Sequence, residues 1–300
     1  MRWPDSTRSW FGLILLLLAA QGALGEPQKI RVTVSIPPQA YFLEQIGGDR
    51  VDVQVLLRPG DSPATFQPTI RQLRRLADSK IYFRIGVPFE ETLLPKLEST
   101  LQRLSIVDTR KNIPFRSMEE HDHSDQPANH HQHDHVQDPH FWLCPLLVKI
   151  QAKTIRDALT RIDPESRERW SANYLSLAKD LDRLDTEIRA ILKPFRGASF
   201  YAYHPAYGYF ADTYGLKQRA LESAGKEPTP RQLHALIKQA KQEQARVIFV
   251  QPQFNRRSAA TVARAIQASV VPMDPLARDY PSNLKNMAKS LARGLNRPDS

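Results

Sequence analysis

The chain has 300 residues, of which 41% are hydrophobic, 25% charged and 8% aromatic. This length allows about two domains with hydrophobic cores, and the composition is ordinary for a soluble globular protein, which excludes wholesale disorder and a protein with many membrane spans. The net charge of +10 is spread along amphipathic segments and not gathered among aromatic residues, so we expect no nucleic-acid binding.

The first 25 residues have the pattern of a cleavable signal peptide. An apolar run over residues 11–20 follows Arg2 and Arg8 and precedes small residues at positions 23 and 25. The run is far shorter than the roughly 20 residues of a membrane-spanning helix, so a retained anchor is the weaker alternative. The only cysteine, Cys144, has no disulfide partner and lies far from the cleavage site, so it cannot carry the lipid of a lipoprotein. We therefore expect a soluble periplasmic protein.

After the signal peptide, strand and helix patterns alternate. We expect strands over residues 30–36, 51–57 and 81–86 and helices over 41–46 and 69–80. The second helix pattern places Ile70, Leu73 and Leu76 on its buried face. Strands and helices that alternate with short connections indicate a parallel sheet covered by helices.

Residues 116–139 interrupt this order. The segment holds six of the nine histidines and almost no apolar residues, so we expect a mobile loop. Its histidines alternate with acidic residues and offer many transient imidazole ligands, which suit zinc better than manganese. The alternative without a metal-binding role is a polar linker whose richness in histidine is accidental. The expected auxiliary metal ligands are His121, His123, His130, His131, His133 and His135.

A long helix is expected in the middle of the chain. Residues 141–159 have a helical pattern, Pro164 suits the first turn of the next helix, and Pro194 ends it. A helix of about 28 residues would be about 40 Å long, enough to bridge two lobes. Its apolar residues recur at spacings of three and four: Trp170, Tyr174, Leu177, Leu181, Leu184, Ile188 and Ile191.

The alternation of strands and helices then resumes. We expect strands over residues 198–205, 247–250 and 269–273 and helices over 206–215, 228–245 and 258–268. The sequence thus predicts an α/β protein of two lobes, each a mostly parallel sheet covered by helices. The expected divisions are an N-terminal lobe at 26–163, a linking helix at 164–193 and a C-terminal lobe at 194–300.

Three polar residues stand where such a fold binds ligands, at strand ends that face the cleft. His204 and Asp274 each end a predicted strand, and His140 lies in the turn before the helix that follows the loop. Two imidazoles and a carboxylate suit zinc and are acceptable to manganese or iron. Taken singly, each residue also has a structural explanation, as a hydrogen-bonded histidine or a turn aspartate.

Five motifs occur together in order: GGDRVDVQVLLRPGDSPATFQPT, DPHFWLCP, YHPAYGYFADTYGL, KEPTPRQL and VVPMDPL. In these motifs and their spacing, residues 29–290 resemble the zinc- and manganese-binding periplasmic solute-binding proteins of ABC transporters, in the ZnuA-like branch of the cluster A-I family. The resemblance implies two α/β lobes bridged by a rigid helix, with one metal ion in the cleft. It also implies His140, His204 and Asp274 as the metal ligands.

The chain departs from the family motif at the first ligand. Where relatives usually have a histidine, this chain has Ala64, which offers no ligand atom. The fourth donor could then be water, a histidine of the loop, or the second oxygen of Asp274. Gln67 and Gln251 replace acidic residues common in relatives, and we interpret them as changes around the ligands or on the surface.

Two other residues have ordinary structural interpretations. His234 is expected on the polar side of a helix, as a surface residue. Cys144 is expected to be a small buried side chain and not a ligand.

The leading functional hypothesis is a protein, expected to be a monomer, that captures zinc or less readily manganese and delivers it to an inner-membrane ABC permease with its ATPase. One alternative is a zinc buffer or metallochaperone without a transporter. Another is a zinc hydrolase, since three protein ligands and one open position are typical of catalytic zinc. The sequence has no HExxH motif and no nucleophile elbow, so we expect no enzyme.

Overall fold

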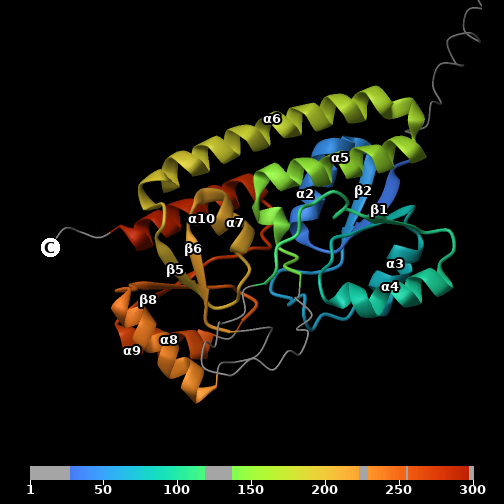
Figure 1. Ribbon diagram of the computed structural model, residues 1–300. Coiled ribbons are helices and arrows are strands. Elements are labelled where there is room, and N and C mark those ends of the chain that lie inside the picture. The colour runs from blue at the N-terminus through green and yellow to red at the C-terminus, as the bar shows by residue number, and fades with distance from the viewer. Residues whose placement is uncertain (1–27, 119–136, 223–228, 255, 297–300) are drawn as a thin grey trace, which may run out of the picture.

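The computed structural model describes residues 28–118, 137–222, 229–254 and 256–296. These residues form two halves, each built on a four-stranded parallel sheet, in the orders β2-β1-β3-β4 and β6-β5-β7-β8 (Figure 1). The predicted two-lobe α/β fold is confirmed. The first sheet consists of β1 (Ile30–Val34), β2 (Val51–Val55), β3 (Ile81–Arg84) and β4 (Ser105–Asp108). The second consists of β5 (Ser199–Ala202), β6 (Lys217–Ala220), β7 (Val247–Val250) and β8 (Ser269–Pro272).

Helices cover both sheets and connect them. The helices of the first half are α2 (Pro37–Gly47), α3 (Ile70–Ala77) and α4 (Phe89–Thr100). The middle of the chain forms the short 3₁₀ helix η3 (Phe141–Leu143), then α5 (Pro145–Ile162) and α6 (Arg167–Leu192). The helices of the second half are α7 (Gly208–Tyr214), α8 (Pro230–Gln242), α9 (Arg256–Ile266) and α10 (Tyr280–Leu295).

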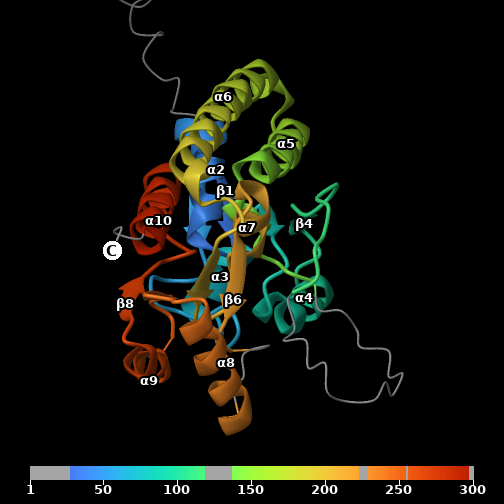
Figure 2. The same cartoon turned by 60° about the vertical axis from the view of Figure 1, so that its left-hand side comes forward.

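The long helix α6 spans both halves. Figure 1 shows it running over the first half and over the second, and Figure 2 shows α5 beside it. Helices α2, α5 and α10 pack against it. Among the residues expected to be buried, Tyr174 and Ile191 are only partly buried, while the others are fully buried. The predicted bridging helix is confirmed, and the exact lobe boundaries at 163 and 194 stay a prediction.

One main hydrophobic core extends through both halves. It contains side chains of the first sheet and of α2, α5 and α6, and it continues into β5, α7 and α10. A smaller core lies between the second sheet and the helices α8 and α9. Because close-packed interiors resist deformation, the shared core holds the two sheets in a fixed relation.

Parts of the structure differ from the sequence prediction. Ile70 was expected to be buried but is 72% exposed, because α3 begins at this residue and only its later turns reach the core. Helix α2 begins at Pro37, several residues earlier than expected, because proline is compatible with the first turn of a helix. Helices α4 and α10 and strands β4 and β6 lie outside the sequence prediction.

Several smaller expectations are settled by the described residues. Gly215 ends α7 in the left-handed conformation, at φ 72°. Cys144 is buried and unpaired, and His234 is exposed, as predicted. The part of the chain that the structure describes contains no helix long and apolar enough to cross a membrane. The predicted signal peptide at residues 1–25 and the six loop histidines lie outside the described residues.

A pair of leucines on α6 tests the shared core. Leu181 is 1% exposed and Leu175 is 59% exposed. We expect Leu181→Ala to lower the free energy of unfolding by about 2–5 kcal/mol, because it leaves a cavity in a close-packed core. The matched variant Leu175→Ala should change it by no more than about 0.5 kcal/mol. Urea unfolding followed by circular dichroism measures both, and equal effects would contradict the assigned core.

Candidate metal site

A cavity of about 140 Å³ lies at the carboxyl ends of the central strands of both sheets. Segments that follow β3, β5, β7 and β8 all contribute to its wall. Cleft binding at strand ends is the rule for open α/β sheets. Lining residues relevant to metal binding are Ala64, Glu91, His140, His204, Gln251 and Gln253.

His140 is held by a buried carboxylate two residues earlier. The Asp138 side chain is fully buried, and its Oδ1 lies 2.7 Å from His140 Nδ1 and accepts a hydrogen bond of 2.9 Å from the His140 backbone N–H. An ionised carboxylate only accepts hydrogen bonds, so in the neutral imidazole the proton is on Nδ1. The Nε2 of His140 is therefore left with its lone pair, the form that binds a metal.

His204 is held in the same way from a different element. It follows β5, and its Nδ1 is hydrogen bonded to the buried carboxylate of Glu222, which follows the neighbouring strand β6. Gln251 fixes the backbone of His204 from β7: its Oε1 accepts from the His204 N–H at 3.2 Å, and its Nε2 donates to the His204 carbonyl at 2.8 Å. The Nε2 of His204 is likewise free to accept a metal.

The two imidazoles lie against each other at the cavity. Their ring centroids are 5.2 Å apart and the ring planes are inclined by 72°. Phe254 stacks on His204 at 5.0 Å, and Trp142 lies 5.1 Å from His140. Two of the three predicted ligands are thus brought together, between aromatic side chains that restrict their rotation.

Burial and charge set the protonation of these groups. Burial lowers the pKa of the His204 imidazole, although the hydrogen bond to Glu222 acts in the opposite direction. Burial also opposes the ionisation of Asp138, but hydrogen bonds from His140 and Arg116 outweigh it and hold the pKa of Asp138 below its ordinary value. The lowered pKa of His204 favours the neutral imidazole that can bind a cation, and the lowered pKa of Asp138 favours the carboxylate that holds His140.

Asp274 is not among the residues that line the cavity, but it is hydrogen bonded to two residues that are. Its Oδ1 accepts hydrogen bonds from Gln253 Nε2 at 3.0 Å and from the Leu276 N–H at 2.9 Å. Gln253 and Leu276 line the cavity, so Asp274 stands behind them. Within the described ranges, no group of three His, Cys, Asp or Glu side chains is close enough together to hold a metal ion. The structure therefore brings together His140 and His204 but not the complete predicted set.

The wall from the first half carries no histidine at the expected place. Ala64 lines the cavity and is exposed, so its methyl group leaves open the space that a longer side chain would fill. Glu91, in the first turn of α4, lines the same wall and is also exposed. Its carboxylate is an oxygen donor that the sequence pattern alone did not identify.

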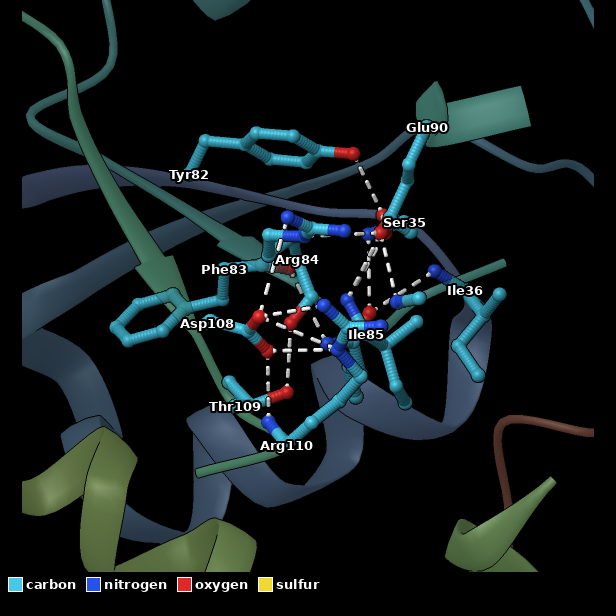
Figure 3. Close-up of polar contacts among 12 residues, drawn as sticks. Ser35, Ile36, Tyr82, Phe83, Arg84, Ile85, Glu90, Asp108, Thr109 and Arg110 are labelled. Carbon is cyan, nitrogen blue, oxygen red and sulfur yellow. Dashed lines mark hydrogen bonds and ion pairs between the residues drawn. The ribbon is translucent and has the colours of Figure 1, made fainter. Parts of the chain in front are cut away.

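A buried carboxylate positions this wall (Figure 3). Glu90 accepts hydrogen bonds from the N–H groups of Ile85 and Gly86, at 2.9 and 2.7 Å, and from the hydroxyl of Ser35. Burial raises the pKa of Glu90, although these hydrogen bonds and Arg84 act against it. Gly86 has a φ of 91°, in the left-handed region that favours glycine. These contacts fix the turn that leads from β3 to the cavity wall.

The roles of four side chains at the site were missed from the sequence. Glu222 follows β6, whose residues KQRA have no apolar alternation, so neither the strand nor its end was predicted. For Gln253 and Glu91, no local sequence pattern indicates a position at the cavity. Asp138 belongs to the DPH motif, where the sequence indicated a turn but not the contact with His140. Of the two glutamine replacements, Gln251 is buried and holds His204, whereas Gln67 is exposed.

Known zinc-uptake and zinc-binding proteins are similar to this chain over most of its length. Residues 32–294 match the family model described as "Zinc-uptake complex component A periplasmic". The high-affinity zinc uptake system protein ZnuA of Bacillus subtilis is 28% identical over 288 residues, covering 90% of this chain and 89% of the relative. The zinc-binding protein AdcA of Streptococcus pyogenes is 27% identical over 260 residues, covering 83% of this chain and 50% of AdcA. The chain thus spans half the length of that relative.

Solved structures give the same result. A crystal structure of ZnuA is 38% identical, covers 90% of this chain and is itself fully covered, with a TM-score of 0.82. A zinc-bound ZnuA deletion mutant has a TM-score of 0.83 at 37% identity, covering 91% of this chain and all of the mutant. These are solute-binding proteins and not enzymes. From the family match over residues 32–294, the chain belongs to the ZnuA family of periplasmic zinc-uptake components.

Proposed function

We propose that this protein binds zinc in the cavity as the solute-binding component of an ABC importer. The observation that carries the proposal is the pair of facing imidazoles, each with its Nδ1 tied to a buried carboxylate. A histidine that binds a metal typically donates its other N–H to a carboxylate or a carbonyl, which orients the ring and raises its basicity. Zinc is here the cargo and is bound through the two Nε2 atoms.

The remaining ligands come from oxygen donors. Asp274 is the third ligand in the proposal, and it reaches the metal when its carboxylate exchanges the hydrogen bond from Gln253 for the cation. With Ala64 in place of a histidine, water or the second Asp274 oxygen completes a tetrahedral site. Zinc is preferred over manganese because imidazole is a borderline-soft ligand.

The proposed location and partners draw on the family match together with the sequence pattern of residues 1–25. The chain would be exported by the signal peptide at residues 1–25 and act in the periplasm without a lipid anchor, as a monomer. It would hand zinc to an inner-membrane permease with its ATPase. The names of the relatives support uptake over a free-standing buffer or metallochaperone. A hydrolase is disfavoured because the matching family model and the relatives are described by zinc uptake.

The ligand assignment is tested by single substitutions. In protein lacking residues 119–136, so that loop sites do not interfere, we expect His140→Ala and His204→Ala to weaken zinc binding by more than about 100-fold, because each removes a direct ligand. Asp274→Ala should weaken it as well, and His234→Ala, which changes an exposed histidine, should not. Titration calorimetry measures all four, and unchanged affinity in both cavity variants contradicts the site.

The carboxylate behind His204 gives a second test. We expect Glu222→Gln to weaken zinc binding by about 10- to 100-fold, because the neutral amide no longer raises the basicity of the imidazole. Glu243→Gln is the matched control, since Glu243 accepts a hydrogen bond from Tyr201 in the same half and does not line the cavity. Competition with a zinc chelator gives both affinities; equal affinities for the two variants would show that Glu222 does not support the ligand.

The missing family histidine gives a third test with two arms. We expect deletion of residues 119–136 to remove only weak zinc sites and to leave the tightest one unchanged, because water or Asp274 completes the site. Ala64→His should tighten the cavity site, because it supplies a further direct ligand at the wall. Loss of the tightest site on deletion, with rescue by Ala64→His, would instead assign the fourth ligand to the loop.

A further inference from the structure

Arg116 lies at the point where the chain enters residues 119–136, and it contacts the support of His140. Its Nη1 donates a hydrogen bond of 2.9 Å to Asp138 Oδ2, while Asp138 Oδ1 holds the His140 imidazole. The Arg116 side chain is 17% exposed and that of Asp138 is fully buried. The guanidinium and the imidazole thus bind opposite oxygens of one buried carboxylate.

Arg116 is itself fixed by α7 of the second half. Its Nε lies 3.0 Å from Asp212 Oδ2, its backbone N–H donates to the Tyr209 hydroxyl at 3.0 Å, and its guanidinium lies over the Tyr209 ring. The chain on either side of residues 119–136 is also joined here. Ser117 and Gln137 form an antiparallel bridge, and the Asp138 N–H donates to the Arg116 carbonyl at 2.9 Å.

Gly208 makes room for this guanidinium. A Cβ built on Gly208 would lie 1.4 Å from Arg116 Nη1 and 3.0 Å from Asp138 Oδ2. No two non-bonded atoms approach so closely, so any side chain at position 208 must displace the arginine. Gly208 has no left-handed φ, so the backbone there accepts alanine without strain. The glycine is needed for close approach and not for its conformation.

We propose that Arg116 is a positioning residue for the metal site, acting on His140 through Asp138. It fixes the carboxylate against α7, so that the imidazole keeps one orientation toward His204. Arg116 lies three residues before the start of segment 119–136. Two hydrogen bonds, from Arg116 to Asp138 and between Asp138 and His140, therefore connect this position to the metal site. The inference rests on the proposed zinc site at His140 and His204.

We call the contacts from Arg116 through Asp138 to His140 the relay. The proposal predicts the effect of substitutions at two separate residues, Arg116 and Gly208. Arg116→Ala removes the guanidinium, and Gly208→Ala displaces it while keeping its charge. We expect each to weaken zinc binding by about 10- to 100-fold, the usual effect of losing a partner behind a metal ligand. The double variant should be no weaker than Arg116→Ala alone, because the two changes remove the same contact. Titration calorimetry in protein lacking residues 119–136 measures the affinities.

Cobalt(II) supplies a readout that a merely structural role would not move. Its visible absorption reports the number and geometry of its ligands, so the spectra of Arg116→Ala and Gly208→Ala should shift toward that of His140→Ala. Arg50→Ala is the matched control, because it breaks an ion pair of 3.0 Å with Asp163 and neither residue lines the cavity. The Arg50 side chain is 20% exposed and that of Asp163 is 14% exposed. It should leave affinity and spectrum unchanged.

The outcomes separate this inference from the proposed function. If the parent protein binds zinc, His140→Ala does not, and both Arg116→Ala and Gly208→Ala bind as the parent does, the relay is wrong and the site stands. If His140→Ala binds as tightly as the parent, the proposed function fails and this inference with it. Should Arg116→Ala not fold, Arg116→Gln is measured beside Gly208→Ala, because a Cβ at position 208 would also lie 3.0 Å from Asp138 Oδ2. Parent-like affinity in both variants would overturn the inference.

Discussion

The indole of Trp142 connects the two halves beside the cavity. The indole Nε1 donates a hydrogen bond of 2.9 Å to the carbonyl of Pro275. The backbone carbonyl of Trp142 accepts a hydrogen bond of 2.8 Å from the Tyr280 hydroxyl. Trp142 is fully buried in the shared core. Because His140 lies two residues before it and Asp274 lies one residue before Pro275, this contact sets the relative position of the segments that carry two proposed ligands.

The polar groups of the cavity depend on that packing. A buried imidazole needs a partner for its N–H, since an unsatisfied buried donor costs about 1–3 kcal/mol. Asp138 and Glu222 meet this need for His140 and His204, and they fix which nitrogen faces the cavity. Each carboxylate in turn needs compensation in the low-dielectric interior, and Arg116 gives it to Asp138. The metal site and the stability of its surroundings are therefore built from the same contacts.

The sequence predicted local features well and long-range contacts poorly. The bridging helix and most strands follow from periodicity, because the spacing of apolar residues directly records which face is buried. His204 lies at the cavity as expected because it follows β5, and open α/β sheets bind ligands at the carboxyl ends of their strands. His140 reaches the same cavity from the turn before η3. Asp138 and Glu222 were not predicted as partners, since no local pattern records which side chains meet across the fold. The position of Asp274 behind Gln253 depends on side-chain hydrogen bonds that no spacing rule specifies.

Alanine at position 64 leaves the histidines of the described cavity residues on one side of the cavity. Both histidines among the described cavity residues are mounted on one rigid unit: His204 follows β5, and His140 is tied through Asp138 and Arg116 to α7. The opposite wall, which carries Ala64, adds no imidazole. The contacts that hold the two rings therefore include none from Ala64, and this side of the cavity mouth is formed without a histidine. In this chain the imidazole pair and the Ala64 side of the cavity entrance are built from different segments.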